Sequence, residues 1–445
     1  MTLIKKVLVV SGDALPLPGY PTSGAGLRAW GIGQGLRSRG FEVTFAMPQV
    51  AVRQDLGSLA CDVDVRPWLP DTLERVIAGA HPDAVVFCHW PSVQIRKRLD
   101  VPTVIDFHGP HMLERAFQGL NHTGSNALTK IEALRKADFF TCAGEKQRLY
   151  FLAWLLASGI DISQPRIASV PVCLSPELPE LMPAPTEITL VYGGVYLPWQ
   201  DPFLSLTVTA EVLDTAQRGM LYLYGGKHPS IPIAVPPIFA TLEKQLRANP
   251  RVSFGGVLPR DQLIEAYRRA TAAVDLMAYN YERELAFTTR TVEYMWCGLP
   301  VIYNDYAELS ALIREYDAGW ILDPSDRAGL TQVLEEVLDN PAVASLRGRN
   351  AQRLVREHLT WDRAIAPLAA FLSSPQSCEA NEADIASFVA AELGTAHFWD
   401  HWSSVKRKDT RALLEDGIRH FRQGGFTQLA RETVGFARRR LHSND

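Results

Sequence analysis

Residues 6–43 read KVLVVSGDALPLPGYPTSGAGLRAWGIGQGLRSRGFEV, a short apolar run that leads through a glycine-containing loop into an amphipathic stretch. The run Lys6–Val10 is typical of a strand that is covered on both faces, as parallel strands are. The amphipathic stretch Leu27–Arg39 predicts a helix that ends at Gly40. A strand, a loop and a returning helix form the repeating unit of a doubly wound α/β sheet.

The same alternation recurs along both halves of the chain. In the first half, further strands are predicted at Glu42–Ala46, Ala84–Cys88, Thr103–Phe107, Asp138–Cys142 and Ile167–Val170. In the second half, they are predicted at Thr189–Tyr192, Leu221–Tyr224, Val252–Phe254, Ala273–Leu276, Val301–Tyr303 and Gly319–Leu322. Helical patterns lie at Ala127–Lys136, Arg260–Arg269, Thr289–Cys297 and Trp361–Leu372. Two halves with one pattern predict two α/β domains.

Two segments without a helical period divide the chain, the proline-rich residues 171–188 and residues 373–384. The predicted domains are residues 1–180, residues 187–372 and a helical appendix at residues 385–445. Ligands of open α/β sheets bind beyond the carboxyl ends of the strands, so two such edges can form a deep site between them. We therefore expect an α/β fold with two Rossmann-like domains facing across a cleft.

The composition is that of an ordinary folded protein. Hydrophobic residues make up 47% and charged residues 21% of the 445 residues, and the formal net charge is −4. This charge argues against a nucleic-acid partner. The six cysteines are far apart and form no C-x-x-C pair, which predicts buried, reduced thiols. The sequence shows no secretory signal pattern and no apolar run of about 18 residues, so we expect a cytoplasmic protein.

Three loops that follow predicted strands contain residues suited to a phosphate-bearing ligand. Gly24 and Gly26 precede the first helix, whose N-terminus favours anions. Gly194 follows the first strand of the second half, in VYGGVYLPWQDP. Lys227 follows a later strand, in LYLYGGKHP, where its ammonium group suits a phosphate contact. The alternatives are a flexible strand-to-helix turn for the first loop and an exposed turn for Lys227.

The stretch VIDFHGPHMLE places four polar side chains directly after a predicted strand: Asp106, His108, His111 and Glu114. A polar group at such a strand end can contact a substrate or a reacting oxygen, so Asp106 and His108 are our catalytic candidates. His89, in VVFCHWP, follows another strand. The alternatives are a capped turn for Asp106 and surface positions for His111 and Glu114. No metal site is predicted, because the two histidines three residues apart lack a third ligand.

Charged residues crowd the stretch YNYERELAFTTRTVEYMWCGLPVIYND, residues 279–305. A helix is predicted to begin at Thr288 or Thr289, either of which can cap it. Arg290 and Glu293 are three residues apart and share a face near its start. A helix N-terminus with an arginine can hold phosphate, and a carboxylate can accept hydrogen bonds from ribose hydroxyls. The alternative is a local ion pair on a solvated helix. The binding candidates here are Arg283, Glu284, Arg290, Thr291 and Glu293.

Three parts of the chain resemble, in the right order, the GT-B glycosyltransferases, and specifically glycosyltransferase family 4. They are SGAGLRAWGIGQGLRSRGFEV, VSFGGVLPRDQLIEAYRRATAAVDL, and TRTVEYMWCGLPVI followed by AGWILDPSD. The resemblance implies that Glu293 binds the donor ribose, that Arg290 lies near the diphosphate and that His108 faces the donor sugar. It also implies a nucleotide sugar as donor substrate, retention of anomeric configuration, no cofactor and no required metal.

The chain departs from the family pattern in two places. The paired glutamates of the family are usually separated by seven residues, whereas Glu284 precedes Glu293 by nine positions. The family's usual Arg and Lys pair after the first strand of the second domain is missing from GGVYLPWQDP. We expect Lys227, Arg283 or Arg290 to supply that charge.

The resemblance predicts transfer of a sugar from a nucleotide sugar to an acceptor hydroxyl, in bacterial surface-polysaccharide or related glycan biosynthesis. One alternative is a nucleotide-sugar epimerase of the same architecture. Another is a non-catalytic subunit that binds sugar nucleotides, which the missing Arg and Lys pair and the shifted glutamate favour and the retained His108, Arg290 and Glu293 oppose. The sequence leaves the nucleotide base, the sugar and the acceptor open.

The predicted appendix is strongly basic. Residues 405–442 carry ten basic and four acidic residues, which gives this segment a net charge of +6 and the rest of the chain −10. Apolar residues recur at a helix-compatible spacing between Phe426 and Leu441. A basic amphipathic helix binds anionic membrane surfaces, so we expect peripheral contact with the inner membrane face and a glycan or lipid-linked acceptor. The alternatives are packing on the protein's acidic body and an oligomer contact.

Overall fold

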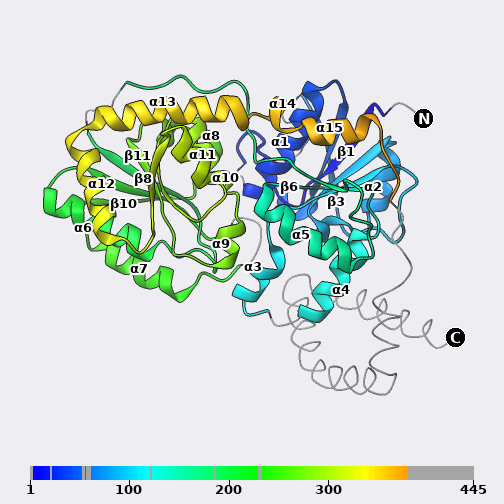
Figure 1. Ribbon diagram of the computed structural model, residues 1–445, viewed down its shortest axis with the longest axis horizontal. Helices are drawn as coiled ribbons and strands as arrows, with labels where there is room; N and C mark the ends of the chain where they lie inside the picture. Colours follow the sequence, from blue (N-terminus) through cyan, green and yellow to red (C-terminus); the bar gives the residue numbers. More distant parts are fainter. Residues whose placement is uncertain are drawn as a thin grey trace, which may run out of the picture. The chain divides into compact units, whose positions relative to one another are not determined.

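The computed structural model describes residues 4–20, 23–52, 56, 62–120, 123–183, 187–228 and 233–378 (Figure 1). These residues fall within one compact unit, Met1–Ala380. The predicted basic appendix lies outside the described residues, and so does the membrane contact expected of it. None of the helices in the described ranges is long and apolar enough to cross a membrane.

The first domain is built on a parallel sheet of seven strands in the order β3-β2-β1-β4-β5-β6-β7. Its strands are β1 (Lys6–Val10), β2 (Glu42–Pro48), β3 (Asp64–Trp68), β4 (Ala84–Cys88), β5 (Thr103–Asp106), β6 (Phe139–Cys142) and β7 (Ile167–Ser169). Val10 pairs with Phe87 of β4, and Cys88 pairs with Asp106 of β5. The loops after β1, β4 and β5 therefore leave the same edge of the sheet.

The second domain is built on a parallel sheet of six strands in the order β10-β9-β8-β11-β12-β13. Its strands are β8 (Thr189–Val195), β9 (Met220–Gly226), β10 (Val252–Gly256), β11 (Ala272–Asp275), β12 (Val301–Asn304) and β13 (Gly319–Leu322). In both sheets the strand order reverses beside the first strand of the domain, at β1 and at β8. That reversal is where open α/β sheets bind their ligands.

Helices flank both sheets. In the first domain they are α1 (Gly24–Ser38), α2 (Leu73–Ala80), α3 (His111–Phe117), α4 (Thr123–Leu134) and α5 (Glu145–Ala157), with the 3-10 turns η1 (Gln49–Ala51) and η3 (Trp90–Ser92). In the second they are α6 (Phe203–Ala216), α7 (Pro237–Arg247), α8 (Arg260–Arg268), α9 (Tyr281–Leu285), α10 (Thr289–Trp296), α11 (Leu309–Glu315), α12 (Arg327–Asp339) and α13 (Pro341–His358). The chain continues with α14 (Trp361–Ala364) and α15 (Ala366–Ser373).

Alternating side chains of the first sheet pack into two separate cores. Val7 and Val9 face the core that contains residues of α1, whereas Leu8 and Val10 face the core that contains residues of α2, α4 and α5. Strand residues are buried on both faces, as the near-continuous apolar runs predict.

The last helices return to the first domain. Ile365 and Leu368 are buried in the same core as Val7 and the residues of α1. Figure 1 shows α14 and α15, in orange, beside α1, in blue. The sequence places Trp361–Leu372 at the end of the second domain, but the structure packs this segment on the first sheet. Local pattern identifies a helix and does not specify the sheet that it covers.

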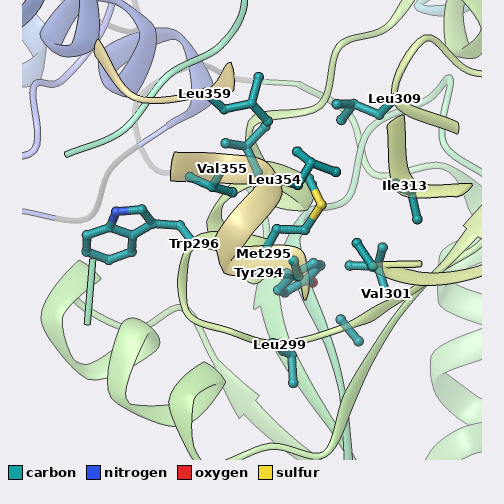
Figure 2. Packing of buried hydrophobic residues seen from close by; sticks show 14 of the residues in the cluster. Tyr294, Met295, Trp296, Leu299, Val301, Leu309, Ile313, Leu354, Val355 and Leu359 are labelled. Atoms are coloured by element: carbon teal, nitrogen blue, oxygen red, sulfur yellow. The ribbon is translucent and has the colours of Figure 1, made fainter. Parts of the chain in front are cut away.

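Helix α10, which carries the most specific motif, is fixed by packing. Met295 lies in one buried cluster with Val301 of β12 and with Leu354 and Val355 of α13 (Figure 2). Leu27 of α1 belongs to the same cluster, so the hydrophobic core continues from one domain into the other. The position of α10 is therefore coupled to that of α1.

The predicted strands and helices are present, with ends that differ by a few residues, and one strand was missed. Strand β3 has the sequence DVRPW, in which Asp64 and Arg66 interrupt the apolar pattern. It is an edge strand, where Pro67 is tolerated. The five cysteines in the described ranges are buried and unpaired, which confirms the prediction for these residues.

Gly26 supports the fold in a way that can be tested. A Cβ atom at Gly26 would lie 1.7 Å from the carbonyl oxygen of Ala14, which is backbone and cannot rotate away. We expect Gly26→Ala to lower the free energy of unfolding by about 2 kcal/mol or more. The matched control is Gly79→Ala in α2, where the nearest atom is 3.7 Å away and alanine should stabilise by about 0.5–1 kcal/mol. Equal denaturation midpoints for the two variants would contradict this packing.

Candidate functional site

The two domains meet through loops at the carboxyl ends of their strands. His228, two residues beyond β9, has its Nε2 3.4 Å from Oδ2 of Asp13, which lies in the loop after β1. A Cβ atom at Gly24, the first residue of α1, would lie 3.1 Å from Oγ1 of Thr289, the first residue of α10. The N-termini of α1 and α10 thus converge. Both ends carry partial positive charge, so an anionic group is favoured beside them.

Arg290 is anchored to the second sheet from α10. Its Nη1 donates to the carbonyl oxygen of Gly193 at 2.6 Å, and its Nη2 lies 3.0 Å from Oδ1 of Asp275. Its Nε is buried without a hydrogen-bond partner among the described residues. Gly194 has a φ of 123°, and a Cβ atom there would lie 2.5 Å from Nη1 of Arg290. The glycine that we predict to make room for a diphosphate thus also makes room for Arg290.

Thr291 and Thr288 have roles that differ from helix capping. The Thr291 hydroxyl donates to Oδ2 of Asp275 at 2.5 Å, so Asp275 accepts from two neighbouring residues of α10. Thr288 is at the N-cap position, but its side chain does not cap the helix. It contacts Thr291 and the hydroxyl of Tyr303 instead. The prediction of a threonine cap is wrong, because nearby hydroxyl groups bind the Thr288 side chain.

Glu293 is a buried carboxylate with one cationic neighbour. Oε1 accepts hydrogen bonds from Nε of Arg260 at 3.1 Å and lies 3.0 Å from its Nη2. Burial raises the pKa of Glu293, and Arg260 opposes that rise. Sequence reasoning missed Arg260, which is 33 residues away at the start of α8. Its position after Pro259 marks a helix start and does not indicate a partner.

The predicted binding residues Arg283 and Glu284 are both engaged within the protein. Arg283 forms a buried two-point ion pair with its neighbour Glu282, at 2.6 and 2.8 Å. Burial raises the pKa of Glu282, and Arg283 opposes that rise. Oε1 of Glu284 lies 3.1 Å from Nζ of Lys146 in the first domain, and Oε2 accepts from the Tyr279 hydroxyl at 2.7 Å. Local sequence patterns indicate neither Glu282 nor Lys146 as a partner.

The first turn of α5 is held by the second domain. The backbone amides of Glu145 and Lys146 donate to the two carboxylate oxygens of Glu308 at 2.9 and 3.0 Å. Nζ of Lys146 also donates to the carbonyl oxygen of Tyr306 at 2.7 Å, and Nε2 of Gln147 donates to that of Leu285 at 2.9 Å. Glu308 therefore acts as a helix cap supplied by the other domain. We call these contacts the α5 clasp.

In the first domain, Asp106 is the centre of a buried network. Nε and Nη2 of Arg28 donate to its two oxygens at 2.7 Å each, and the Thr141 hydroxyl donates to Oδ1 at 2.6 Å. Nε2 of His108 lies 3.4 Å from Oδ2 of Asp106 and has no hydrogen-bond partner in the described part of the chain. Asp106 is fully buried and therefore shielded from solvent. Its carboxylate contacts Arg28 of α1 and lies close to His108.

Three imidazole rings gather at this strand end. His89 stacks on His108 with ring centroids 5.5 Å apart and meets His111 edge-on at 5.1 Å. Burial lowers the pKa of His108 to about 4 and that of His89 well below its ordinary value. Both rings are therefore neutral at pH 7. Nδ1 of His111 lies 3.1 Å from Oε2 of Glu114, so these two residues interact with each other.

One predicted binding residue, Lys227, lies on a loop of the second domain. Lys227 follows β9 and is exposed. Within the described ranges, histidines, cysteines, aspartates and glutamates form no group of three or more that could hold a metal ion. The positions of Gly24, Gly194, Arg290 and Glu293 agree with a site at the strand ends, but their roles in ligand binding stay predictions.

Comparison with known proteins points to one group of enzymes. Residues 184–354 match the family described as "Glycosyl transferases group 1". A D-inositol 3-phosphate glycosyltransferase of Corynebacterium efficiens is 25% identical over 191 residues, 43% of either chain. A glycogen synthase of Mycobacterium tuberculosis is 23% identical over 340 residues, 72% of either chain. The chain thus spans less than half the length of the first of these relatives.

Solved structures show the fold. Sucrose-phosphate synthase from Thermosynechococcus elongatus superposes with a TM-score of 0.63 at 17% identity, covering 82% of this chain and 98% of that one. Anabaena HepE in complex with UDP and glucose superposes with a TM-score of 0.60 at 13% identity, covering 83% and 100%. The two parallel sheets with flanking helices form a GT-B fold. The family match covers residues 184–354, and the solved structures, at 17% identity or less, show the fold.

The α5 clasp can be tested without a substrate. Glu308→Ala removes the acceptor for two backbone amides, so hydrogen exchange at the first turn of α5 should rise by about fivefold to thirtyfold, as expected for a lost cap of about 1–2 kcal/mol. The measurement is amide hydrogen exchange of the segment that contains Glu145 and Lys146. Glu315→Ala, an exposed glutamate at the end of α11, is the matched control. Unchanged protection in Glu308→Ala would rule the clasp out.

Proposed function

We propose that this protein transfers a sugar from a nucleoside-diphosphate sugar to an acceptor hydroxyl, with retention of configuration and without a metal, as glycosyltransferases of family 4 do. The observation that carries the proposal is the convergence of the N-termini of α1 and α10 beside Arg290 and Glu293. Anion-favouring backbone, a buried arginine and a buried carboxylate suit the diphosphate and the ribose of such a donor.

The diphosphate would lie between the two helix N-termini. The N–H groups of α10 at Thr289 and Arg290 are not capped by Thr288. Nε of Arg290 is a second donor that is buried and unpartnered in the described structure. Negative charge on the leaving diphosphate grows as its bond to the sugar breaks, and donors already held in place stabilise it without reorganising. This part of the site replaces the Arg and Lys pair that the sequence lacks.

The ribose would be held by Glu293. Arg260 occupies Oε1, and we assign the other carboxylate oxygen, Oε2, to the ribose hydroxyls. A bond to Arg260 keeps the carboxylate charged despite burial. A charged acceptor forms stronger hydrogen bonds with hydroxyl groups than a neutral one does.

The sugar would face His108. A neutral imidazole can accept from or donate to a sugar hydroxyl without placing positive charge beside an oxocarbenium-like transition state. In the transfer, the bond between the anomeric carbon and the diphosphate oxygen breaks while the acceptor oxygen bonds to the anomeric carbon on the same face. The acceptor proton leaves with the diphosphate. The α5 clasp would hold the domains together and limit the entry of water.

The donor and acceptor classes are also part of the proposal. UDP-sugars are the first donors to test, because HepE and a trehalose-6-phosphate synthase were solved with UDP-containing ligands. We propose a glycan or lipid-linked acceptor in bacterial polysaccharide synthesis on the cytoplasmic side. The basic segment 405–442 would bring the site to the membrane surface.

The assignment of Glu293 is tested in a screen of UDP-, GDP- and dTDP-sugars that measures release of the nucleoside diphosphate. We expect one donor class to be consumed and Glu293→Gln to lower kcat/KM by about 100-fold, the effect of losing a charged hydrogen bond of about 3 kcal/mol. The control is Glu265→Gln, an α8 glutamate that pairs with Arg268 and Arg269. Binding of a donor without turnover would favour the non-catalytic subunit, and isomerisation of the sugar would favour the epimerase.

Metal independence is tested with a chelator. We expect the rate in about 5–10 mM EDTA to equal the untreated rate, because helix N-termini and Arg290 balance the charge on the diphosphate. Loss of activity that manganese or magnesium restores would contradict this proposal. A donor-only assay run in parallel separates an effect on the donor from an effect on the acceptor.

A further inference from the structure

Arg28 lies beneath the candidate site and touches none of the groups that we assign to the donor. It projects from α1, and its side chain is 3% exposed, whereas that of Asp106 is fully buried. Two parallel hydrogen bonds of 2.7 Å join Nε and Nη2 of Arg28 to the two oxygens of Asp106. Such bidentate pairs fix orientation as well as charge. An ion pair of this depth is costly to form, so a purely structural role would be served as well by apolar residues.

The two oxygens of Asp106 are shared among three neighbours. Oδ1 accepts from Nη2 of Arg28 and from the Thr141 hydroxyl. Oδ2 accepts from Nε of Arg28 and lies 3.4 Å from Nε2 of His108. The Asp106 carboxylate therefore lies against both the Arg28 guanidinium and the His108 ring. The net charge next to the His108 ring therefore depends on Arg28, which neutralises Asp106.

Several other ionisable groups face His108. They are Asp13 from the loop after β1, His89 from the loop after β4 and Glu114 from α3, and His111 of α3 and Lys130 of α4 lie beside His89. Asp13 and Glu114 favour a protonated ring, as Asp106 does, and Arg28 opposes it. Three carboxylates thus favour protonation of one histidine, and Arg28 is the cation that opposes it.

We propose that Arg28 is a positioning residue for the transfer reaction, which acts through Asp106 to hold His108 as a neutral, oriented imidazole facing the donor sugar. The proposal rests on the proposed function for its catalytic meaning. A protonated His108 would bind Asp106 tightly, turn away from the sugar and repel the developing positive charge at the anomeric carbon. Arg28 satisfies Asp106 first and so leaves the imidazole available.

The proposal explains why an arginine occupies this place in a helix. A lysine has one donor site at its tip and cannot contact both carboxylate oxygens in the plane of the group. Nη1 of Arg28 is buried and has no hydrogen-bond partner in the described structure. The bidentate pair with Asp106 therefore leaves one donor of the guanidinium unsatisfied. The arrangement serves Asp106 and leaves the guanidinium incompletely satisfied.

The test is the titration of His108 in the full-length protein, followed by NMR of histidine labelled with ¹⁵N and ¹³C and assigned by its loss in His108→Gln. Burial holds the pKa of His108 at about 4 in the native chain. In Arg28→Gln the uncompensated Asp106 should raise this pKa by about 1 or more, a change on the order of tenfold to a hundredfold in the protonation equilibrium. The double variant Arg28→Gln with Asp106→Asn removes both charges and should bring the pKa back down.

Activity gives a second readout. In Arg28→Gln the acid limb of the pH profile of kcat should move to higher pH, with KM for the donor changed by less than about threefold. Arg28→Lys keeps a cation and should show a smaller rise in the pKa of His108, which keeps the proposal testable if Arg28→Gln does not fold. An unchanged pKa in the folded single variants overturns the proposal, and so does a rise that the double variant does not reverse. These titrations need no substrate, so failure of the proposed function would appear separately, as absence of turnover in the native chain.

Discussion

A buried aspartate at the carboxyl end of a central strand, paired with an arginine from a neighbouring helix, is the constraint on which both halves of the site depend. In the first domain Asp106 ends β5 and pairs with Arg28 of α1, and Thr141 adds a hydrogen bond. In the second, Asp275 ends β11 and pairs with Arg290 of α10, and Thr291 adds a hydrogen bond. Each carboxylate is nearly removed from water and would be costly without its partner. The helix is thereby fixed to the strand end in a single orientation.

This constraint gives the two helix N-termini their positions. Since α1 and α10 share a hydrophobic cluster and approach closely at Gly24 and Thr289, their positive ends reinforce each other. The α5 clasp acts at another place on the same interface, where Glu308 caps a helix of the other domain. Polar contacts of this kind are weaker than a hydrophobic core and can be remade, which suits an enzyme that must admit a donor and release a nucleotide.

Burial decides the chemistry of the polar groups in the site. The same loss of solvent that keeps His108 and His89 neutral raises the pKa of Glu293 and of Glu282. An acid that retains its charge there does so because an arginine is close, as Arg260 is to Glu293. Neutral bases and charged acids can therefore coexist in one site at pH 7. That combination suits a reaction in which positive charge develops on a sugar while negative charge develops on a leaving diphosphate.

The sequence by itself determined the α/β class, the two parallel sheets and the placement of Arg290, Glu293 and His108 at helix starts and strand ends, because period and glycine position are local properties of the chain. It did not reveal β3, whose polar edge-strand sequence lacks an apolar run, or the return of α15 to the first sheet. Only the tertiary structure decided the partners: Arg28 for Asp106, Arg260 for Glu293, Lys146 for Glu284 and Glu308 for α5. Residues 33 to 163 positions apart form these pairs, and no local pattern encodes a contact made by folding.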